Sequence, residues 1–229
     1  MRRLLFFLLL TLCSSASETQ YAQGEKLYNI ACISCHGING EALTGIKLIV
    51  NPRKLTNSIL SQQQSFQIIK KGAYYWGAHS DMMPSFESIF SDAEIDAISF
   101  YVKEAFNKNL EKKITALLKE EKMQPEESAD ILALGKKIFH KRCAKCHGET
   151  GDGQSSFVEV SKQHKEFIYP YDLQRTILNE NQIFLFTKYG GDYWGSKTSD
   201  MPSWKEKYND FQLKAVAKYI HNNIKKADK

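Results

Sequence analysis

A five-residue pattern of two cysteines and a histidine occurs twice in this chain of 229 residues. It reads Cys32-Ile-Ser-Cys35-His36 near the N-terminus and Cys143-Ala-Lys-Cys146-His147 in the second half. C-x-x-C-H is the sequence to which c-type haem is attached: the cysteines form thioethers to the porphyrin edge, and the histidine is an axial ligand of the iron. The spacing keeps all three groups on about one helical turn. Two copies therefore predict two covalently attached haem c groups.

A zinc site and a redox-active dithiol use the same residue types and are the alternatives to haem attachment. Zinc would need a fourth ligand for each Cys-Cys-His set, in both halves. A thioredoxin-like dithiol would need strands, and the sequence has no convincing alternating strand pattern. If Cys13 is removed with an N-terminal signal, the other four of the five cysteines all lie in the two motifs, and none is left for a structural disulfide.

Residues 1–16 have the pattern of a secretory signal peptide. Arg2 and Arg3 precede an apolar run from Leu4 to Leu12, and Ser14-Ser15-Ala16 offers small residues for cleavage. The run is too short to span a bilayer, although an uncleaved anchor is an alternative. Cys13 follows a sequence with some likeness to a lipobox, so a lipid anchor at this residue is a further alternative. Export predicts a periplasmic protein, in agreement with c-type haem attachment outside the bacterial inner membrane.

The two motifs lie within a longer internal repeat, which is offset by 111 residues up to the histidines and by 118 residues beyond them. The change of offset predicts a seven-residue insertion between His147 and Pro170. The matched positions are Gly24/Gly135, Tyr28/Phe139, Cys32/Cys143, Pro52/Pro170, Leu55/Leu173, Lys70/Lys188, Gly72/Gly190, Tyr75-Trp76-Gly77/Tyr193-Trp194-Gly195, Met83-Pro84-Ser85-Phe86/Met201-Pro202-Ser203-Trp204 and Tyr101/Tyr219.

Helix signals recur in both repeats and predict an all-α fold. Helices are expected to open at Tyr21 and Ile131 and to run into the two motifs. Capping-box pairs predict four further helix starts, and Gly72 and Gly190 are expected C-caps. These pairs are Ser61/Gln64, Asn179/Gln182, Ser91/Glu94 and Asn209/Gln212. The predicted division is a signal at 1–16, a first domain at 17–110, a charged helical linker at 111–130 and a second domain at 131–229. The linker is either a solvated extension of the first domain or a spacer that packs across the interface.

Each iron needs a second axial ligand, and methionine is the usual partner of histidine in electron-transfer haems. Met201 is the choice in the second half, and the repeat register selects Met83 over Met82 in the first. A proline follows each of these two methionines and would stiffen the loop that carries it. His79 is the rival ligand in the first domain.

With these residues, the chain resembles tandem dihaem class I cytochromes c of the c4-like kind, from about Gly24 to the last helix. That resemblance implies two cytochrome c domains, each wrapped around one haem, and it implies that Pro52 and Pro170 offer their carbonyls to the ligand histidines. Tyr75, Trp76, Tyr193 and Trp194 are expected to pack near the haems. The linker is longer than usual in this family, which argues against tight two-fold packing of the haems. Similar chains also serve as cytochrome subunits of periplasmic dehydrogenases.

Charge is unevenly distributed along the chain. Residues 131–229 carry 17 Lys and Arg against 11 Asp and Glu, whereas residues 17–110 carry 8 against 9. Lys141, Arg142 and Lys145 flank the second motif, where they either steer an acidic partner or merely solvate a helix.

We expect a one-electron carrier, not an enzyme, between redox proteins such as a periplasmic dehydrogenase and a membrane-bound oxidase or reductase. The alternatives are an electron-accepting subunit of an oxidoreductase, for example for a sulfur compound, and a haem enzyme such as a peroxidase or thiosulfate dehydrogenase. Two complete ligand sets argue against the haem enzyme. The modest basic excess of an exported protein does not support nucleic-acid binding.

Overall fold

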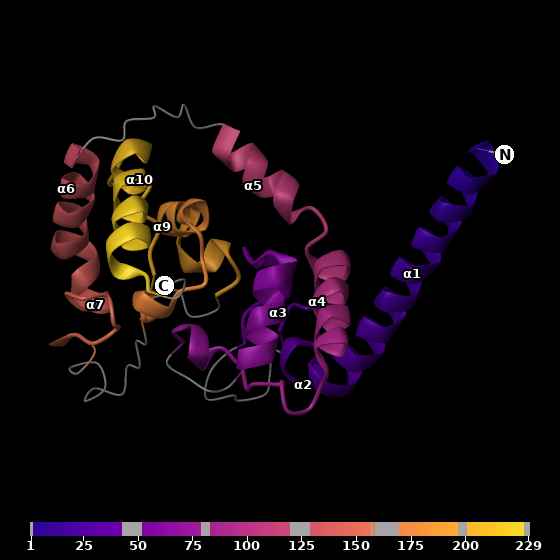
Figure 1. Cartoon of the computed structure of the whole chain (residues 1–229). Helices are drawn as coiled ribbons and strands as arrows, with labels where there is room; N and C mark the ends of the chain where they lie inside the picture. The colour runs from indigo at the N-terminus through magenta and orange to yellow at the C-terminus, as the bar shows by residue number, and fades with distance from the viewer. Residues whose placement is uncertain are drawn as a thin grey trace.

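The protein is all-helical throughout the part of the chain that the computed structural model describes, as the helix signals predict (Figure 1). The described residues are 2–42, 52–78, 83–119, 129–156, 158, 170–196 and 201–226, with side chains from residue 17 onward. The elements of the first half are α1 (Arg2–Ala31), α2 (Ile33–His36), η1 (Leu55–Asn57), α3 (Gln62–Lys71), η2 (Tyr74–Trp76), α4 (Asp92–Phe106) and α5 (Leu110–Lys119). Those of the second half are α6 (Ala129–Ile138), η3 (Phe139–Cys143), α7 (Ala144–His147), η4 (Leu173–Arg175), α9 (Glu180–Tyr193), α10 (Asp210–Tyr219) and η5 (Ile220–Ile224).

Each half is held together by a crossing of two helices, α1 with α4 and α6 with α10 (Figure 1). A glycine lies at each crossing. A Cβ on Gly24 would be 2.0 Å from the carbonyl oxygen of Ala97, and a Cβ on Gly135 would be 2.1 Å from that of Ala215. The two helix backbones can therefore approach this closely only because both positions lack a side chain.

All four predicted capping boxes are present, at the starts of α3, α4, α9 and α10. Gly72 is the C-cap of α3, as predicted, with φ of 79°. Gly190 has φ of 80° and interrupts the helical backbone inside α9, which resumes to end at Tyr193. The chain thus leaves the helix at the same repeat position in both halves, at a residue that tolerates positive φ.

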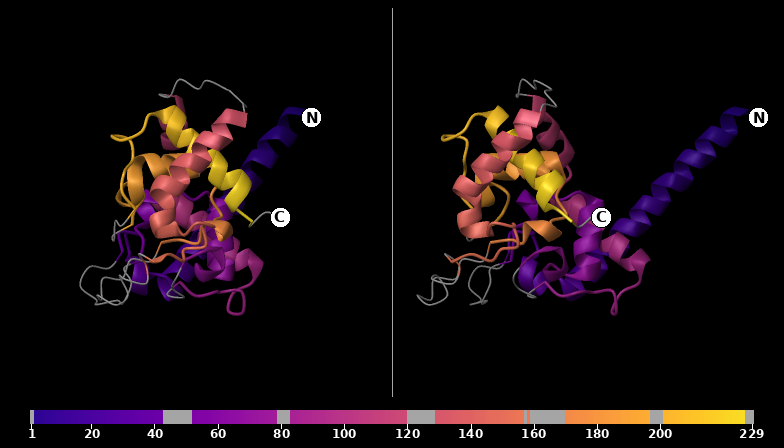
Figure 2. Two further views of the ribbon diagram at one scale, coloured as in Figure 1. Left: turned by 90° about the vertical axis from the view of Figure 1, so that its left-hand side faces the viewer. Right: turned by 60° about the vertical axis from the view of Figure 1, so that its left-hand side comes forward.

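The first helix is longer than predicted. It begins at Arg2 rather than near Tyr21 and continues without a break through residues 14–16, where signal cleavage is expected. Its N-terminal part projects away from the rest of the molecule in all views (Figures 1 and 2). Among the described residues, no helix has both the length and the apolar character needed to cross a membrane.

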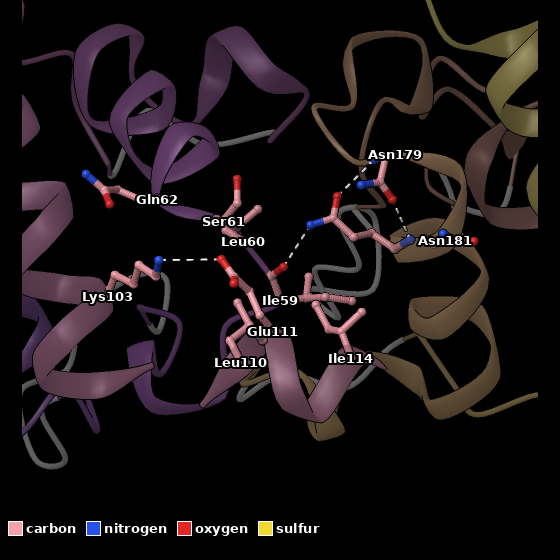
Figure 3. A pocket seen from close by; sticks show the side chains of 11 residues that line it. Ile59, Leu60, Ser61, Gln62, Lys103, Leu110, Glu111, Ile114, Asn179 and Asn181 are labelled. Atoms are coloured by element: carbon pink, nitrogen blue, oxygen red, sulfur yellow. Dashed lines mark hydrogen bonds and ion pairs between the residues drawn. The ribbon is translucent and has the colours of Figure 1, made fainter. Parts of the chain in front are cut away.

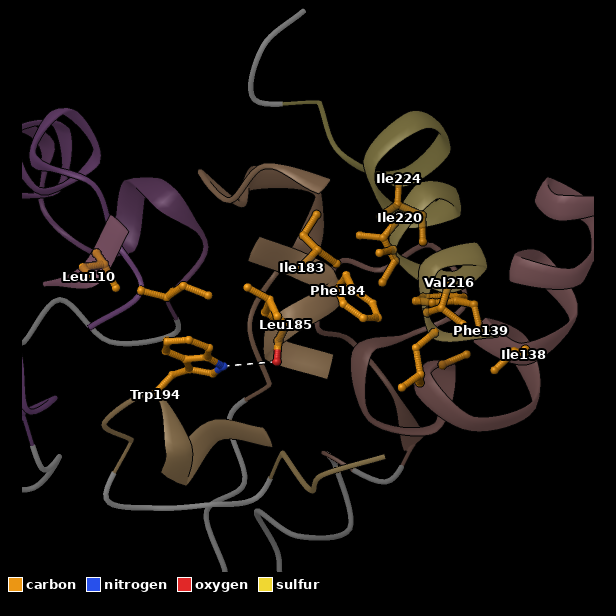
Figure 4. Close-up of a cluster of buried hydrophobic side chains, with 14 residues drawn as sticks. Leu110, Ile138, Phe139, Ile183, Phe184, Leu185, Trp194, Val216, Ile220 and Ile224 are labelled. Atoms are coloured by element: carbon orange, nitrogen blue, oxygen red, sulfur yellow. Dashed lines mark hydrogen bonds between the residues drawn. The ribbon is translucent and has the colours of Figure 1, made fainter. Parts of the chain in front are cut away.

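The described part of the linker, α5, packs against the second half. Leu110 is 7% exposed and belongs to the same buried cluster as Trp194, Leu185 and Ile59 (Figure 4). Ile114 and two leucines of α5 pack against that cluster. Of the two interpretations of residues 111–130, these contacts favour a spacer that packs across the interface.

The two halves meet with reciprocal contacts between repeat-equivalent residues. The side-chain amides of Gln64 and Gln182 donate to each other's oxygens, both at 2.7 Å. The Gln64 amide also donates to the Ile177 carbonyl at 2.9 Å, and the Gln182 amide to the Ile59 carbonyl at 2.8 Å. These residues pair at the 118-residue offset, so the contacts follow a pseudo-two-fold relation. The length of the linker therefore does not prevent close two-fold packing of the domains.

Candidate functional site

The two motif histidines have equivalent positions and equivalent hydrogen bonds. The Nδ1–H of His36 donates to the Arg53 carbonyl at 3.2 Å, and that of His147 to the Tyr171 carbonyl at 3.0 Å. This fixes the tautomer and leaves Nε2 with its lone pair for a metal. Burial lowers the pKa of His36, although the hydrogen bond to the Arg53 carbonyl acts in the opposite direction. The lowered pKa favours the neutral ring that a metal requires.

The carbonyl acceptors differ from those that the resemblance implied. In both halves the acceptor belongs to the residue after the expected proline, Arg53 rather than Pro52 and Tyr171 rather than Pro170. Proline fixes its own φ and restricts the residue before it, but neither restriction determines which carbonyl turns toward the imidazole. The next carbonyl is the one that faces the imidazole.

The four motif cysteines are thiols rather than disulfides. Cys32 and Cys143 lie where α1 meets α2 and η3 meets α7, and Cys35 and Cys146 lie within α2 and α7. Burial, reinforced by the neighbouring thiol of each motif, raises the pKa of Cys32 to about 11 and that of Cys143 to about 12. A redox-active dithiol uses a thiolate, which these surroundings disfavour. Within the described ranges, no three Cys, His, Asp or Glu residues are grouped so as to hold a metal ion by themselves.

Each methionine of the Met-Pro pairs is held by its backbone at the end of a helix. The Met83 carbonyl accepts from the Ala73 amide at 3.0 Å, and the Met201 carbonyl from the Gly191 amide at 2.9 Å. Met83 also packs against the cluster that contains Cys32. The two rival residues of the first domain, Met82 and His79, lie outside the described residues.

Each loop is also fixed by the serine after its proline. The Ser85 hydroxyl donates to the Lys70 carbonyl at 2.7 Å, and the Ser203 hydroxyl to the Lys188 carbonyl at 2.8 Å.

Trp204 follows Ser203, and its buried indole N–H is the one buried side-chain polar group without a hydrogen-bond partner in the described part of the chain. A pair of thiols, a histidine held at Nδ1 and an anchored methionine loop recur in each half, so the residues fit one haem per half.

The aromatic pairs that recur in both repeats have structural partners of their own. The Trp76 indole donates to the Gln67 carbonyl and the Trp194 indole to the Leu185 carbonyl, both at 3.1 Å. Trp194 is 1% exposed in the cluster that joins α5 to the second half, while Tyr75 is 55% exposed. Packing of these residues near the haems stays a prediction.

The surfaces around the two motifs differ in charge. Lys141, Arg142 and Lys145 are exposed beside the second motif. At the 111-residue offset, the first motif has Ile30, Ala31 and Ser34 in their places, and Ile30 is 68% exposed. At these described positions, exposed basic residues therefore accompany the second motif and not the first.

The interface between the halves was not foreseen from the sequence. Its Gln64 and Gln182 were identified only as capping residues, and their spacing of 118 residues was the available signal for their pairing. A small cleft opens beside this pair. It lies between Ile59 and Asn179 of the two halves and Glu111 of α5, where Lys103 forms an ion pair with Glu111 at 3.4 Å (Figure 3).

Comparison with known proteins matches both halves to cytochrome families. Residues 19–102 match the family model described as cytochrome c oxidase, cbb3-type, subunit III, and residues 132–223 match that described as cytochrome c. The cytochrome bc1 complex cytochrome c subunit of Corynebacterium diphtheriae is 29% identical over 147 residues, which cover 57% of this chain and 46% of that protein.

The cbb3-type cytochrome c oxidase subunit FixP of Azorhizobium caulinodans is 24% identical over 207 residues, covering 87% of this chain and 58% of that protein. The chain thus spans about half of the length of these curated relatives. Among solved structures, a chain of the Kuenenia stuttgartiensis reducing HAO-like protein complex is 19% identical, with a TM-score of 0.46 over 86% of this chain and 94% of that one.

Proposed function

Because the chain consists of two tandem cytochrome c domains, each with one covalently attached haem, we propose that it carries single electrons between redox proteins. The observation that carries this proposal is the duplicated set of a histidine held at Nδ1 and a methionine loop anchored to a helix end. When bound, each haem supplies an iron that cycles between Fe(III) and Fe(II). Export to the periplasm is part of the proposal and is supported by the sequence of residues 1–16.

In this proposal His36 and Met83 are the axial ligands in the first domain, and His147 and Met201 in the second. A hydrogen bond to a fixed carbonyl holds each imidazole, and a second one holds each methionine loop. Residues that are already held in this way would move little when a bound haem changes its oxidation state, which would favour rapid electron transfer. If both residues hold the iron, no position would be left there for a substrate.

The ligand assignment is tested by replacing each methionine in turn. Met83→Ala and Met201→Ala should each open one iron, so that the reduced protein binds about one carbon monoxide per chain and loses half of its ferric methionine–iron absorption band. Met82→Ala and Met123→Ala are the matched controls and should bind none. Carbon monoxide binding by the unsubstituted protein, or turnover of peroxide or thiosulfate by it alone, would point instead to a haem enzyme.

An electron-accepting subunit of an oxidoreductase is the second candidate, because the named relatives are subunits of bc1 and cbb3-type complexes. Purification of the chain from its own host distinguishes the two functions. A subunit should copurify with a partner in fixed proportion, whereas a carrier should purify alone and exchange electrons rapidly with membranes.

The exposed basic residues beside the second motif are proposed to dock an acidic partner. Lys141→Gln and Lys145→Gln should slow electron transfer at low salt and weaken its dependence on ionic strength, because each removes one steering charge. Lys112→Gln on α5, which is also exposed, is the control and should leave the rate unchanged. Rates that do not depend on salt in the unsubstituted protein would contradict docking at this face.

A further inference from the structure

The segments that hold the two histidines also cross the domain interface. Directly after the Arg53 carbonyl, the Lys54 amide donates to the Gly195 carbonyl of the second domain at 2.9 Å. Directly after the Tyr171 carbonyl, the Asp172 amide donates to the Gly77 carbonyl of the first domain, also at 2.9 Å. The two bonds are equivalent at the 118-residue offset, so they are exchanged between the domains.

The acceptor glycines belong to the turns that hold the methionine loops. In the second domain the turn runs from Gly191, whose amide binds the Met201 carbonyl, to Gly195, and the Ser196 amide closes it on the Gly191 carbonyl at 3.0 Å. The first domain repeats this arrangement from Ala73 to Ala78, around the Met83 carbonyl. One short turn therefore lies between the methionine of one domain and the histidine segment of the other.

We propose that these two amide–carbonyl bonds couple the haem sites, so that each methionine turn positions the histidine of the opposite domain. The proposal rests on the axial ligands assigned above. A thioether binds ferrous iron more strongly than ferric iron, so the Met201 loop would be held more tightly when the bound haem is reduced. That difference is transmitted through Gly195 and Lys54 to the carbonyl that orients His36, and in the reverse sense from Met83 to His147.

The backbones of the two domains are in close contact at both of these hydrogen bonds. A Cβ on Gly77 would lie 2.3 Å from the Asp172 carbonyl oxygen, and a Cβ on Gly195 would lie 2.6 Å from that of Lys54. Arg175 adds another contact between the domains, since its guanidinium donates to the Tyr74 carbonyl at 2.9 Å. Close-packed contacts of this kind shift together rather than deform independently.

Proline substitution can delete one of these bonds. Lys54 has φ of −67°, which proline adopts without strain, so Lys54→Pro removes the amide donor without requiring a different φ at residue 54. Lys54→Ala is the matched control, because it loses the same side chain and its ion pair with Glu41 but keeps the amide. We expect Lys54→Pro, and not Lys54→Ala, to shift the iron-bound Met201 methyl signal in spectra of the reduced protein labelled with ¹³C-methyl methionine.

The same substitution should shift the midpoint potential of the second haem, which lies in the other domain. An unchanged Met201 signal and potential in Lys54→Pro would overturn the coupling. If the proposed axial ligands were wrong, the unsubstituted protein itself would show no iron-bound methionine signal, so the two failures can be told apart. Gly72→Ala tests the coupling in the opposite direction, since the atoms nearest to its Cβ belong to the Met83–Ser85 loop; it should change the second haem as well as the first.

Coupling is reciprocal, so it can also be measured from the methionine side without a proline variant. Met201→Ala should accelerate hydrogen exchange at the Lys54 amide, and Met83→Ala should do so at the Asp172 amide. Acceleration confined to the domain that carries the substitution would overturn the proposal.

Discussion

Gly24 and Gly135 show how much a single residue decides in this molecule. Both lie where two helix backbones touch, and a Cβ at either position would be within about 2 Å of a carbonyl oxygen on the opposing helix. The repeat pointed to these glycines as matched positions, and the helix crossing supplies the reason for them.

Gly24→Ala and Gly135→Ala should each destabilise the holoprotein, because α1 must move away from α4, or α6 from α10. Overpacking of a tight contact costs about 1–3 kcal/mol, and the closeness of these contacts places both variants at the upper end. Denaturant unfolding measures the loss. Gln23→Ala, at the exposed neighbour of Gly24, is the control and should have little effect.

A single residue, Ser91, also lowers the pKa of Glu94 in the capping box of α4. The Ser91 hydroxyl and then the Ser91 amide donate to its carboxylate and hold its pKa below the usual value. A lowered folded pKa stabilises the protein above the unfolded pKa, and this contribution is lost as pH falls through the folded value.

Ser91→Ala should therefore raise the pKa of Glu94 toward its ordinary value, which an NMR titration of the carboxyl carbon measures. Loss of the N-cap should also cost about 1 kcal/mol of stability at neutral pH. Ser91→Asp, which retains a capping oxygen, should recover the stability. A Glu94 pKa that stays low in Ser91→Ala would contradict this assignment.

At the scale of elements, the four capping boxes look alike in sequence but do different work. Gln212 only caps α10, whereas Gln64 and Gln182 cap α3 and α9 and also bind each other across the interface. Their oxygens close the capping box, and their amide groups make the contacts between domains. Cap and interface can therefore be separated by changing the amide alone.

Gln182→Glu keeps the capping oxygen and removes the donor to Gln64 and to the Ile59 carbonyl. Gln182 is 4% exposed, so these groups lose their partners away from water, at a cost of about 1–3 kcal/mol. Gln212→Glu should be neutral, because Glu already serves in the capping box of α4. Equal unfolding free energies for the two variants would show that the interface pair contributes nothing.

At the scale of the whole molecule, the two domains form a pseudo-two-fold pair with different surfaces. The interface uses equivalent residues on both sides, while the exposed basic residues that flank the second motif have no basic counterparts at the equivalent, described positions of the first. This combination suits a carrier whose two haems communicate with each other but meet different partners. α5 adds an asymmetric contact, since Lys113 places its ammonium 4.4 Å from the centre of the Tyr193 ring.

The sequence alone determined the features that depend on a few neighbouring residues. The C-x-x-C-H motifs, the capping boxes and the C-cap at Gly72 are local patterns, and their spacing carries the chemistry or the hydrogen bonds directly. The all-α fold followed from the same signals. The repeat added the matched methionines, whose role as ligands stays a prediction.

The tertiary structure decided what depends on residues far apart in the chain. Whether Pro52 or Arg53 turns its carbonyl to His36 is set by the path of the backbone after the proline, which composition does not encode. The Gln64–Gln182 pair and the Lys54–Gly195 bond join residues more than 100 positions apart. Such contacts arise only when both domains have folded and their buried surfaces select one arrangement, so local patterns carry no record of them.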